Sequence, residues 1–292
     1  MLPSPFKPLA RRVLDRFAVY GSRRYVAGAS SQDALEAART SPGGIERFII
    51  CPWNRPEDSP TEVFQSYTDA LEALRDFTGD CFLSIKLPSL NYDTGMITEL
   101  IERASVRSTR IHLDALTADS VERTIKILHI LRAHFSNLGS TVPGRWRRSL
   151  NDLPKLLDLE LPLRIVKGQL PDREGGEIDP SLGFLRLIEA IQCSSKPIGV
   201  ASHDRSLVER SIAHLSRHAI PCEVEQLFGL ALIPRSTAPE TPRRLYIPYG
   251  HGYPPYDIYG ALRDPQRALR LSYDVIAGFL GRRSNGALTQ RI

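Results

Sequence analysis

The sequence has few cysteines, and nothing pairs them. Its 292 residues include four, Cys51, Cys81, Cys193 and Cys222, which lie far apart and form no CxxC motif. Three of the four fall in short apolar runs typical of strands, and free cysteine is usually buried. We therefore expect buried thiols in a reducing, cytoplasmic setting rather than a disulfide framework.

Long apolar runs are missing as well. No stretch approaches the roughly 18 consecutive apolar residues that a membrane-spanning helix needs, and the first residues show no apolar signal core. We expect a cytoplasmic protein and leave peripheral membrane contact open.

Positive charge is in excess but is not concentrated. The formal net charge is +5, and the lysines and arginines are scattered in short clusters. No basic stripe interleaved with aromatic residues is present, so a nucleic-acid partner is not expected. A mild preference for anionic ligands such as phosphates is the more natural consequence of this charge.

Three catalytic signatures are absent. No GxGxxG motif follows the first predicted strand, which disfavours a dinucleotide-binding open sheet. HExxH is missing, and we expect no metal site. A GxSxG elbow is also missing, which argues against a serine nucleophile.

The chain does contain a regular alternation of strands and helices. Strand-like runs occupy residues 48–51, 81–87, 110–114, 163–167, 197–201, 222–224 and 245–247, with a weaker one at 140–144. The weak one contains Pro143, which fits poorly in a central strand. Helix-length amphipathic segments separate them at 60–77, 94–106, 118–136, 149–158, 181–193 and 205–217. This alternation predicts an α/β fold, a (β/α)8 barrel over 41–292, preceded by a helical segment over 1–40 and closed by a helix over 256–280.

Polar residues stand at the carboxyl ends of most predicted strands, which form the active-site rim of such a barrel. They are Lys86, Asp114, Lys167, the run 202–204 (SHD), Glu223, Glu225, Tyr246 and Tyr249. Lys86 and Asp114 lie at matching heights on neighbouring strands, so an architectural ion pair between them is one interpretation. Convergence of several charges on one pocket is the functional alternative. Backbone N–H groups at the helix start after His203 would suit a phosphate.

An ordered set of motifs resembles the proline dehydrogenase family, which consists of flavin-dependent (β/α)8 barrels. The similar segments are 25–28 (YVAG), 83–87 (LSIKL), 111–114 (IHLD), 163–168 (LRIVKG), 200–204 (VASHD), 223–229 (EVEQLFG) and 245–250 (LYIPYG). Their order and approximate spacing match over residues 20 to 280.

The resemblance implies FAD as the cofactor and a small amine or imino-acid substrate. Hydride would pass from the carbon beside the amine nitrogen to the flavin, and electrons would go on to a quinone, oxygen or a redox protein. Arg164 would sit near the flavin N5 edge. The other implied cofactor residues are Val166, Lys167, Gly168, Ser202, His203 and Glu225; the implied substrate residues are Lys86, Asp114, Tyr246 and Tyr256.

The sequence departs from the family where the substrate carboxylate would bind. The family pattern Tyr-x-x-Arg-Arg-x-x-Glu reads YDIYGALR at 256–263, so Tyr259 and Gly260 replace the two clamping arginines and Arg263 replaces the glutamate. Neither tyrosine nor glycine can form a bidentate Arg–carboxylate contact. Leu170 and Pro143 stand at two further positions where the family has Tyr and Gln.

These departures lead to three hypotheses. The first is a flavin-dependent oxidoreductase acting on an amine other than free L-proline, with Tyr259 among the substrate residues. The second is an ordinary proline dehydrogenase in which Arg263 replaces the lost clamp. The third is a barrel without flavin chemistry that serves as a binding or scaffold protein.

Overall fold

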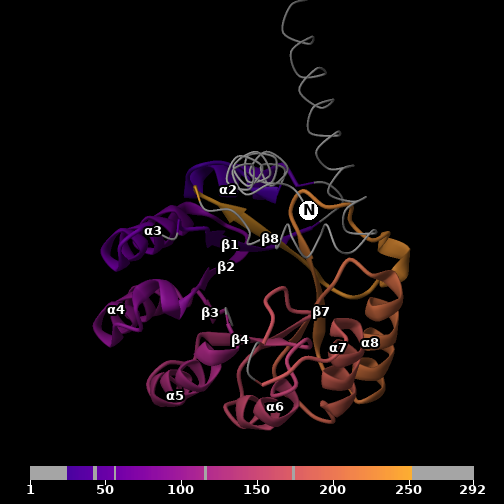
Figure 1. Ribbon diagram of the computed structural model, residues 1–292. Helices are drawn as coiled ribbons and strands as arrows, with labels where there is room; N and C mark the ends of the chain where they lie inside the picture. Colours follow the sequence, from indigo (N-terminus) through magenta and orange to yellow (C-terminus); the bar gives the residue numbers. More distant parts are fainter. Residues whose placement is uncertain (1–24, 42–44, 56, 115–116, 173–174, 252–292) are drawn as a thin grey trace, which may run out of the picture.

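Eight parallel strands form a closed barrel in the computed structural model, which describes residues 25–41, 45–55, 57–114, 117–172 and 175–251. Each strand pairs with the next, and β8 returns to pair with β1 (Figure 1). The strands are β1 (Arg47–Pro52), β2 (Asp80–Ile85), β3 (Ile111–Leu113), β4 (Leu138–Pro143), β5 (Leu163–Val166), β6 (Ile198–Ala201), β7 (Cys222–Leu227) and β8 (Arg243–Tyr249). The predicted (β/α)8 barrel is confirmed.

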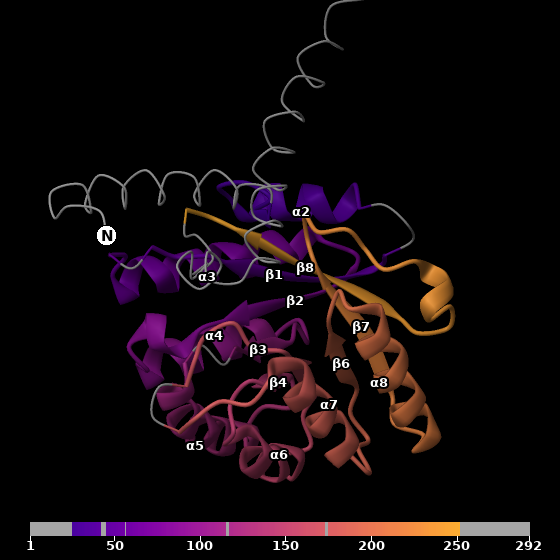
Figure 2. The same cartoon turned by 45° about the vertical axis from the view of Figure 1, so that its right-hand side comes forward.

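Helices surround the strands on the outside of the barrel (Figures 1 and 2). Within the described ranges, the α-helices are α2 (Ser31–Arg39), α3 (Pro60–Ala73), α4 (Thr94–Ser105), α5 (Val121–Arg132), α6 (Ser149–Leu157), α7 (Pro180–Ala190) and α8 (Arg205–Arg217). Short 3-10 turns are η3 (Leu74–Asp76), η4 (Leu87–Leu90), η5 (Ala118–Ser120) and η6 (Arg235–Thr237). The predicted segment 118–136 divides into η5 and α5. The predicted helix 256–280 and most of the segment 1–40 lie outside the described residues.

Local sequence explains where the helices begin and which face they bury. The side chain of Ser59 accepts a hydrogen bond from the backbone N–H of Glu62, and Pro60 occupies the first turn of α3, a strong start signal. Asp204 caps α8 in a similar way by accepting from Leu207 N–H. In α4 the buried residues are Ile97, Leu100, Ile101 and Ala104, the spacing of one helical face.

The strand containing Pro143 is a full member of the barrel, although its bounds lie toward the N-terminus of the predicted ones. All six residues of β4 are buried. Its pairing with β3 ends at Leu113 and Ser140, because β3 has only three residues. Pro143 therefore lies beyond the β3 ladder, where its missing N–H costs no strand hydrogen bond. Gly144 N–H continues the pairing with β5 by donating to Val166 O at 2.7 Å.

Apolar and polar residues are separated by the barrel wall. The large apolar core, which includes Leu83, Ile165 and Ile247, fills the space between strands and helices. The interior carries buried polar residues instead, because alternate strand residues face inward. Ion pairs between strands that are not neighbours, such as Arg164 of β5 with Asp114 after β3, can form only through this interior. The polar interior therefore contains the candidate site.

Candidate functional site

Asp114 is the centre of a hydrogen-bond cluster in the carboxyl-terminal half of the barrel. Its Oδ2 atom accepts from Ser84 Oγ at 2.6 Å and from the Tyr246 hydroxyl at 3.1 Å. Its Oδ1 atom accepts from Thr141 Oγ1 at 2.8 Å and forms an ion pair with Arg164 Nη2. Four neighbours from β2, β4, β5 and β8 thus converge on one carboxylate, which is buried.

The charges of Asp114 and Arg164 stabilise each other. Burial by itself would raise the pKa of Asp114, but Arg164, together with smaller effects that include Lys86 and the hydrogen bond from Ser84, outweighs it, and the pKa falls well below its ordinary value. Burial would lower the pKa of Arg164, but Asp114 and Glu225 raise it overall. Both groups are therefore ionised at neutral pH.

Glu225 is the second acidic neighbour of Arg164. Its Oε2 lies 3.6 Å from Arg164 Nη1, and both atoms are buried without a hydrogen-bond partner among the described residues. Burial raises the pKa of Glu225, and Arg164 opposes that rise. Gly199 makes room for this carboxylate, since a Cβ at that position would collide with Glu225 Oε1. Arg164 also lies 4.9 Å from the centre of the Tyr246 ring, a cation–π contact.

Sequence reasoning missed His112, which is also part of this cluster. Its Nε2 atom lies 3.0 Å from Thr141 Oγ1. Because the Thr141 hydroxyl already donates to Asp114, His112 must be the donor in this contact, and the neutral ring carries its proton on Nε2. Burial and then Arg164 hold the pKa of His112 well below its ordinary value. Its place inside the motif 111–114 was the available signal.

Of the two interpretations of Lys86 and Asp114, the architectural ion pair between them is not the one that forms. Asp114 pairs with Arg164, and the Lys86 ammonium donates to Cys51 Sγ at 2.9 Å. The Lys86 backbone N–H donates to the Tyr67 hydroxyl at 2.9 Å, which fixes the carboxyl end of β2. Lys86 is half-buried, so its ammonium stays at the barrel mouth while Arg164 reaches further inside.

The loops after β5 and β6 carry a second group of expected residues. Lys167 Nζ lies 3.5 Å from Asp204 Oδ2, which links the two loops. His203 is held by the main chain on both ring nitrogens: Nε2 accepts from Leu227 N–H at 2.8 Å, and Nδ1 lies 3.0 Å from Ala231 O. The Ser202 hydroxyl accepts from Asp204 N–H at 3.0 Å. These loops therefore form a shared rim beside Arg164.

Backbone geometry explains two residues at the end of β5. Val166 pairs with Ala201 and, through its carbonyl, with Gly144. Gly168 has φ +89°, and a Cβ there would lie 2.9 Å from Pro143 Cβ, so a side chain is excluded on both counts. Tyr256, Tyr259 and Arg263 lie outside the described residues, so their expected place near this mouth stays a prediction.

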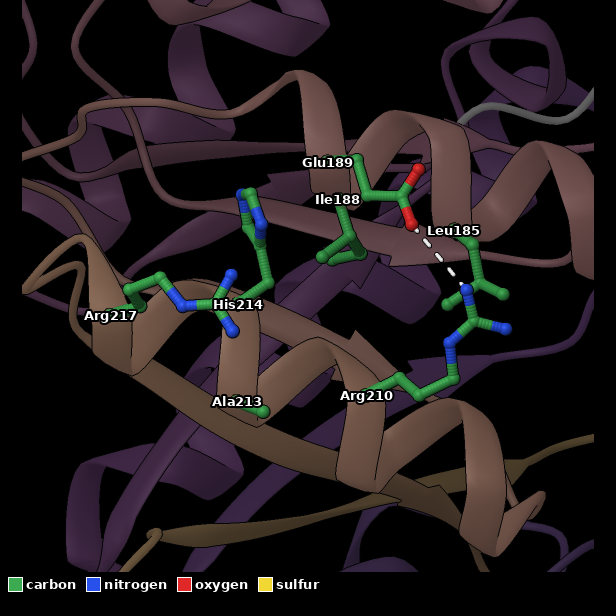
Figure 3. A pocket seen from close by; sticks show the side chains of 7 residues that line it. All are labelled: Leu185, Ile188, Glu189, Arg210, Ala213, His214 and Arg217. Atoms are coloured by element: carbon green, nitrogen blue, oxygen red, sulfur yellow. Dashed lines mark hydrogen bonds and ion pairs between the residues drawn. The ribbon is translucent and has the colours of Figure 1, made fainter.

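A groove on the outer wall does not belong to this site. It lies between α7 and α8, has a volume of about 440 Å³, and is crossed by the ion pair of Arg210 with Glu189 at 3.5 Å (Figure 3). Its lining includes Ile188 and His214 but none of the expected site residues. Among the described residues, no group of three or more His, Cys, Asp or Glu is arranged to hold a metal ion. Within the same ranges, no helix is both long and apolar enough to cross a membrane.

Comparisons with known proteins find relatives in sequence and in fold. No family model matches the chain. Proline dehydrogenase 1 from Bacillus subtilis subsp. natto is 27% identical over 256 residues, covering 79% of this chain and 82% of the relative. The protein of the same name from Bacillus subtilis strain 168 shows the same identity and coverage.

Solved structures of proline utilization A proteins share the fold. The protein from Bdellovibrio bacteriovorus, inactivated by N-propargylglycine, has a TM-score of 0.70 at 14% identity. That from Corynebacterium freiburgense has a TM-score of 0.66 at 18% identity. They cover 88% and 94% of this chain, which spans only 32% and 35% of their lengths. The chain is thus similar in sequence to two proline dehydrogenases, and it shares its closed eight-stranded barrel with the proline utilization A structures.

Proposed function

We propose that the chain is an FAD-dependent oxidoreductase that removes a hydride from the carbon next to an amine nitrogen. The observation that carries this proposal is Arg164, a buried cation held by Asp114 and Glu225 inside a barrel related to proline dehydrogenases. A fixed cation suits a flavin because it stabilises the anionic reduced ring. When bound, the flavin accepts the hydride; the residues of this chain bind, orient and shield the reactants.

The charge of the rim residues supports a bound flavin. Lys167 is half-buried, so its ammonium can reach a ligand above the barrel, and Gly168 keeps the loop close to the β4 end. Because main-chain groups engage both nitrogens of His203, its ring would contact the cofactor through a face or edge. Arg164 Nη1, which has no hydrogen-bond partner among the described residues, would be the donor nearest the reacting ring.

The two carboxylates beside Arg164 would affect cofactor reduction. Asp114 and Glu225 together offset more than one positive charge, so Arg164 stabilises a reduced flavin less than an isolated arginine would. Lys167 and Lys86 supply positive charge at the mouth, and each contacts a protein group rather than Arg164. The two lysines would orient and neutralise ligand groups at the mouth, while Arg164 would act from inside the barrel.

We propose that the substrate is an amine or imino compound other than free L-proline. The family clamp for the proline carboxylate is replaced by Tyr259 and Gly260. Asp114 cannot select a substrate ammonium easily, because its oxygens already accept from Ser84, Thr141, Arg164 and Tyr246. Tyr246 and Lys86 would line the substrate side, with Tyr256 and Tyr259 completing it.

The test begins with the absorption spectrum of the purified protein and a titration with FAD. Stoichiometric binding is expected; a colourless protein that takes up no FAD would support the scaffold alternative and remove this proposal. L-proline is then added without oxygen. Rapid bleaching of the flavin by free L-proline would remove the altered-substrate part. Reoxidation by a quinone, by oxygen or by a redox protein would identify the electron acceptor.

An ordinary proline dehydrogenase is the second candidate, favoured by the 27% identity to proline dehydrogenase 1. In that case Arg263 would bind the carboxylate, and Arg263→Ala should raise KM for L-proline by roughly 10- to 100-fold, taking a charged hydrogen bond as about 1.5–3 kcal/mol. Steady-state kinetics would measure this. Arg282→Ala is the matched control. An unchanged KM in Arg263→Ala would remove the substitute-clamp idea.

A further inference from the structure

A polar cavity lies at the opposite end of the barrel from the candidate site. It has a volume of about 540 Å³ and is lined by residues at the amino-terminal ends of the strands. Arg47, Asp80 and Arg244 come from the starts of β1, β2 and β8, and Arg110 directly precedes β3. The amino-terminal end of such a barrel normally serves stability rather than chemistry. A cavity lined by this many charged side chains is therefore unusual at this end of the barrel.

Inside this cavity, three guanidinium groups share two carboxylates as their ion-pair partners. Glu223 accepts from Arg244 at 2.7 and 3.0 Å and from Arg47 at 3.2 Å. Asp80 accepts from Arg244 at 3.0 Å with each carboxylate oxygen, and lies 3.5 Å from Arg47. Arg110 reaches Glu223 only at 3.7 Å. Glu223 and Asp80 therefore pair mainly with Arg244 and Arg47. The contact of Arg110 with Glu223 is the longest of these ion pairs.

Two more arginines line the rim of the same cavity. Arg75 pairs with Glu72 at 2.6 Å, outside the cavity lining. Arg107 is exposed and donates to the backbone oxygen of Arg75 at 3.2 Å, so its hydrogen-bond partner is a neutral carbonyl. Positive charge at this end therefore exceeds negative charge, and Arg107 and Arg110 carry the excess.

Among the cations of this cavity that are largely buried, Arg110 is the least compensated. Its guanidinium lies 3.7 Å from the centre of the Phe82 ring, and only 18% of its side chain is exposed. Its Nε atom is buried and has no hydrogen-bond partner among the described residues. Burial and then the nearby Arg244 lower the pKa of Arg110 to about 10. A buried cation is costly unless an anion accompanies it, so this position is prepared for an additional negative group.

We propose that this cavity binds a phosphate group, either as the free ion or as part of a small phosphomonoester. Arginine donors match the oxygens of phosphate in geometry as well as in charge. Arg110 would donate from the buried side and Arg107 from the rim, while Ser108 and Thr109, which line the same cavity, offer hydroxyl groups. The cavity lies at the opposite end of the strands from the proposed flavin site, and Phe82, which contacts Arg110, also stacks on His112 of the Asp114 cluster with ring centres 5.6 Å apart.

Thermal unfolding of the full-length protein tests this site. Inorganic phosphate is titrated against chloride at equal ionic strength, because phosphate also stabilises proteins in general by exclusion from their surface. Specific binding gives a saturable rise in Tm that follows ligand concentration. Arg107→Gln should raise the half-saturating phosphate concentration by about tenfold, the effect of one lost charged hydrogen bond. Arg107 is exposed, so this variant should fold, and circular dichroism checks that it does.

The matched control is Arg103→Gln, which lies one helical turn earlier in α4 and pairs with Glu99 away from the cavity. It should keep the wild-type phosphate response. Arg110→Gln should lose the response, and if that variant fails to fold, Arg107→Gln decides alone. The same titration with glycerol 3-phosphate distinguishes a phosphomonoester from the free ion by which one binds tighter. A linear, non-saturating rise, or equal half-saturation in Arg107→Gln and Arg103→Gln, would overturn the proposal.

Discussion

At the scale of single residues, Asp114 acts as an anchor for its neighbours. Its two oxygens accept from Ser84, Thr141, Tyr246 and Arg164, so little accepting capacity remains for a ligand. Its main effect is to fix the position and charge of Arg164. The sequence predicted Asp114 at a strand end, which the structure shows, and it offered an ion pair with Lys86 as one interpretation. Charge and position along the strand could not distinguish Lys86 from Arg164 as the partner of Asp114. In the structure, Arg164 extends across the barrel interior and forms the ion pair.

Replacing Asp114 by Asn should destabilise the fold by about 3–5 kcal/mol, because Arg164 stays buried without its closest counter-charge. The pKa of Asp114 is lower in the folded state than its ordinary 3.8. Its contribution is thus fully present above about pH 4 and is lost as pH falls below that value. Measured by urea unfolding, the free energy of unfolding should fall less between pH 7 and pH 2 in Asp114→Asn than in the wild type. A parallel pH curve in wild type and variant would contradict this role.

Gly199 offers a second residue-scale prediction. A methyl group at this position would collide with the Glu225 carboxylate and displace it from Arg164. Gly199→Ala should cost about 1–3 kcal/mol, the usual effect of overpacking. Chemical denaturation measures this cost. In the Glu225→Ala background the collision is removed, so the added cost of Gly199→Ala should fall close to zero; full additivity of the two changes would argue against the contact.

At the scale of elements, the loops after β6 and β7 are joined by one side chain. His203 follows β6, and its ring is held by Leu227 N–H at the end of β7 and by the Ala231 carbonyl beyond it. The sequence did not predict this link. The motif around His203 indicated a contact with a ligand instead. Its position was predicted correctly, but its partners depend on how two separate loops fold over each other.

His203→Phe should test whether the ring or its nitrogens matter. Phenylalanine keeps an aromatic face but removes both main-chain contacts. Hydrogen exchange at the Leu227 amide should become faster by roughly 5- to 30-fold, from the loss of one or two hydrogen bonds at about 1 kcal/mol each. FAD affinity is measured for the same variant. Its fold-decrease should be smaller than the fold-increase in the exchange rate at Leu227. Unchanged exchange at Leu227 would show that the loop does not depend on this ring.

Strand β4 shows how an element can be found by pattern and explained only by structure. Its alternation with helices predicted a strand despite Pro143. What makes the proline acceptable is the early end of β3 at Leu113, which leaves no ladder for a donor at residue 143. Strand length is set by packing around the whole barrel, so local propensity could not supply it.

At the scale of the molecule, the even alternation of strands and helices, together with the missing GxGxxG motif, was enough to favour a closed barrel over an open sheet. The interior was harder to predict. Arg47, Asp80 and Arg110 are far apart in sequence and stand where strands begin, which resembles ordinary solvent-facing charge. Closing the barrel brings them around Glu223 and Arg244. Their convergence is a property of the closed barrel and of no single motif.

The pairing of β8 with β1 also has a consequence for biosynthesis. Arg244 donates to the Phe48 carbonyl of β1, to Asp80 of β2 and to Glu223 of β7, so one late residue joins the earliest strands to the last ones. A ribosome releases Arg47 and Asp80 long before it releases Arg244. During that interval the edge of β1 has no partner, and the acidic groups lack their main counter-charge. We therefore expect the nascent chain to acquire its final protection from aggregation and proteolysis only after β8 has emerged.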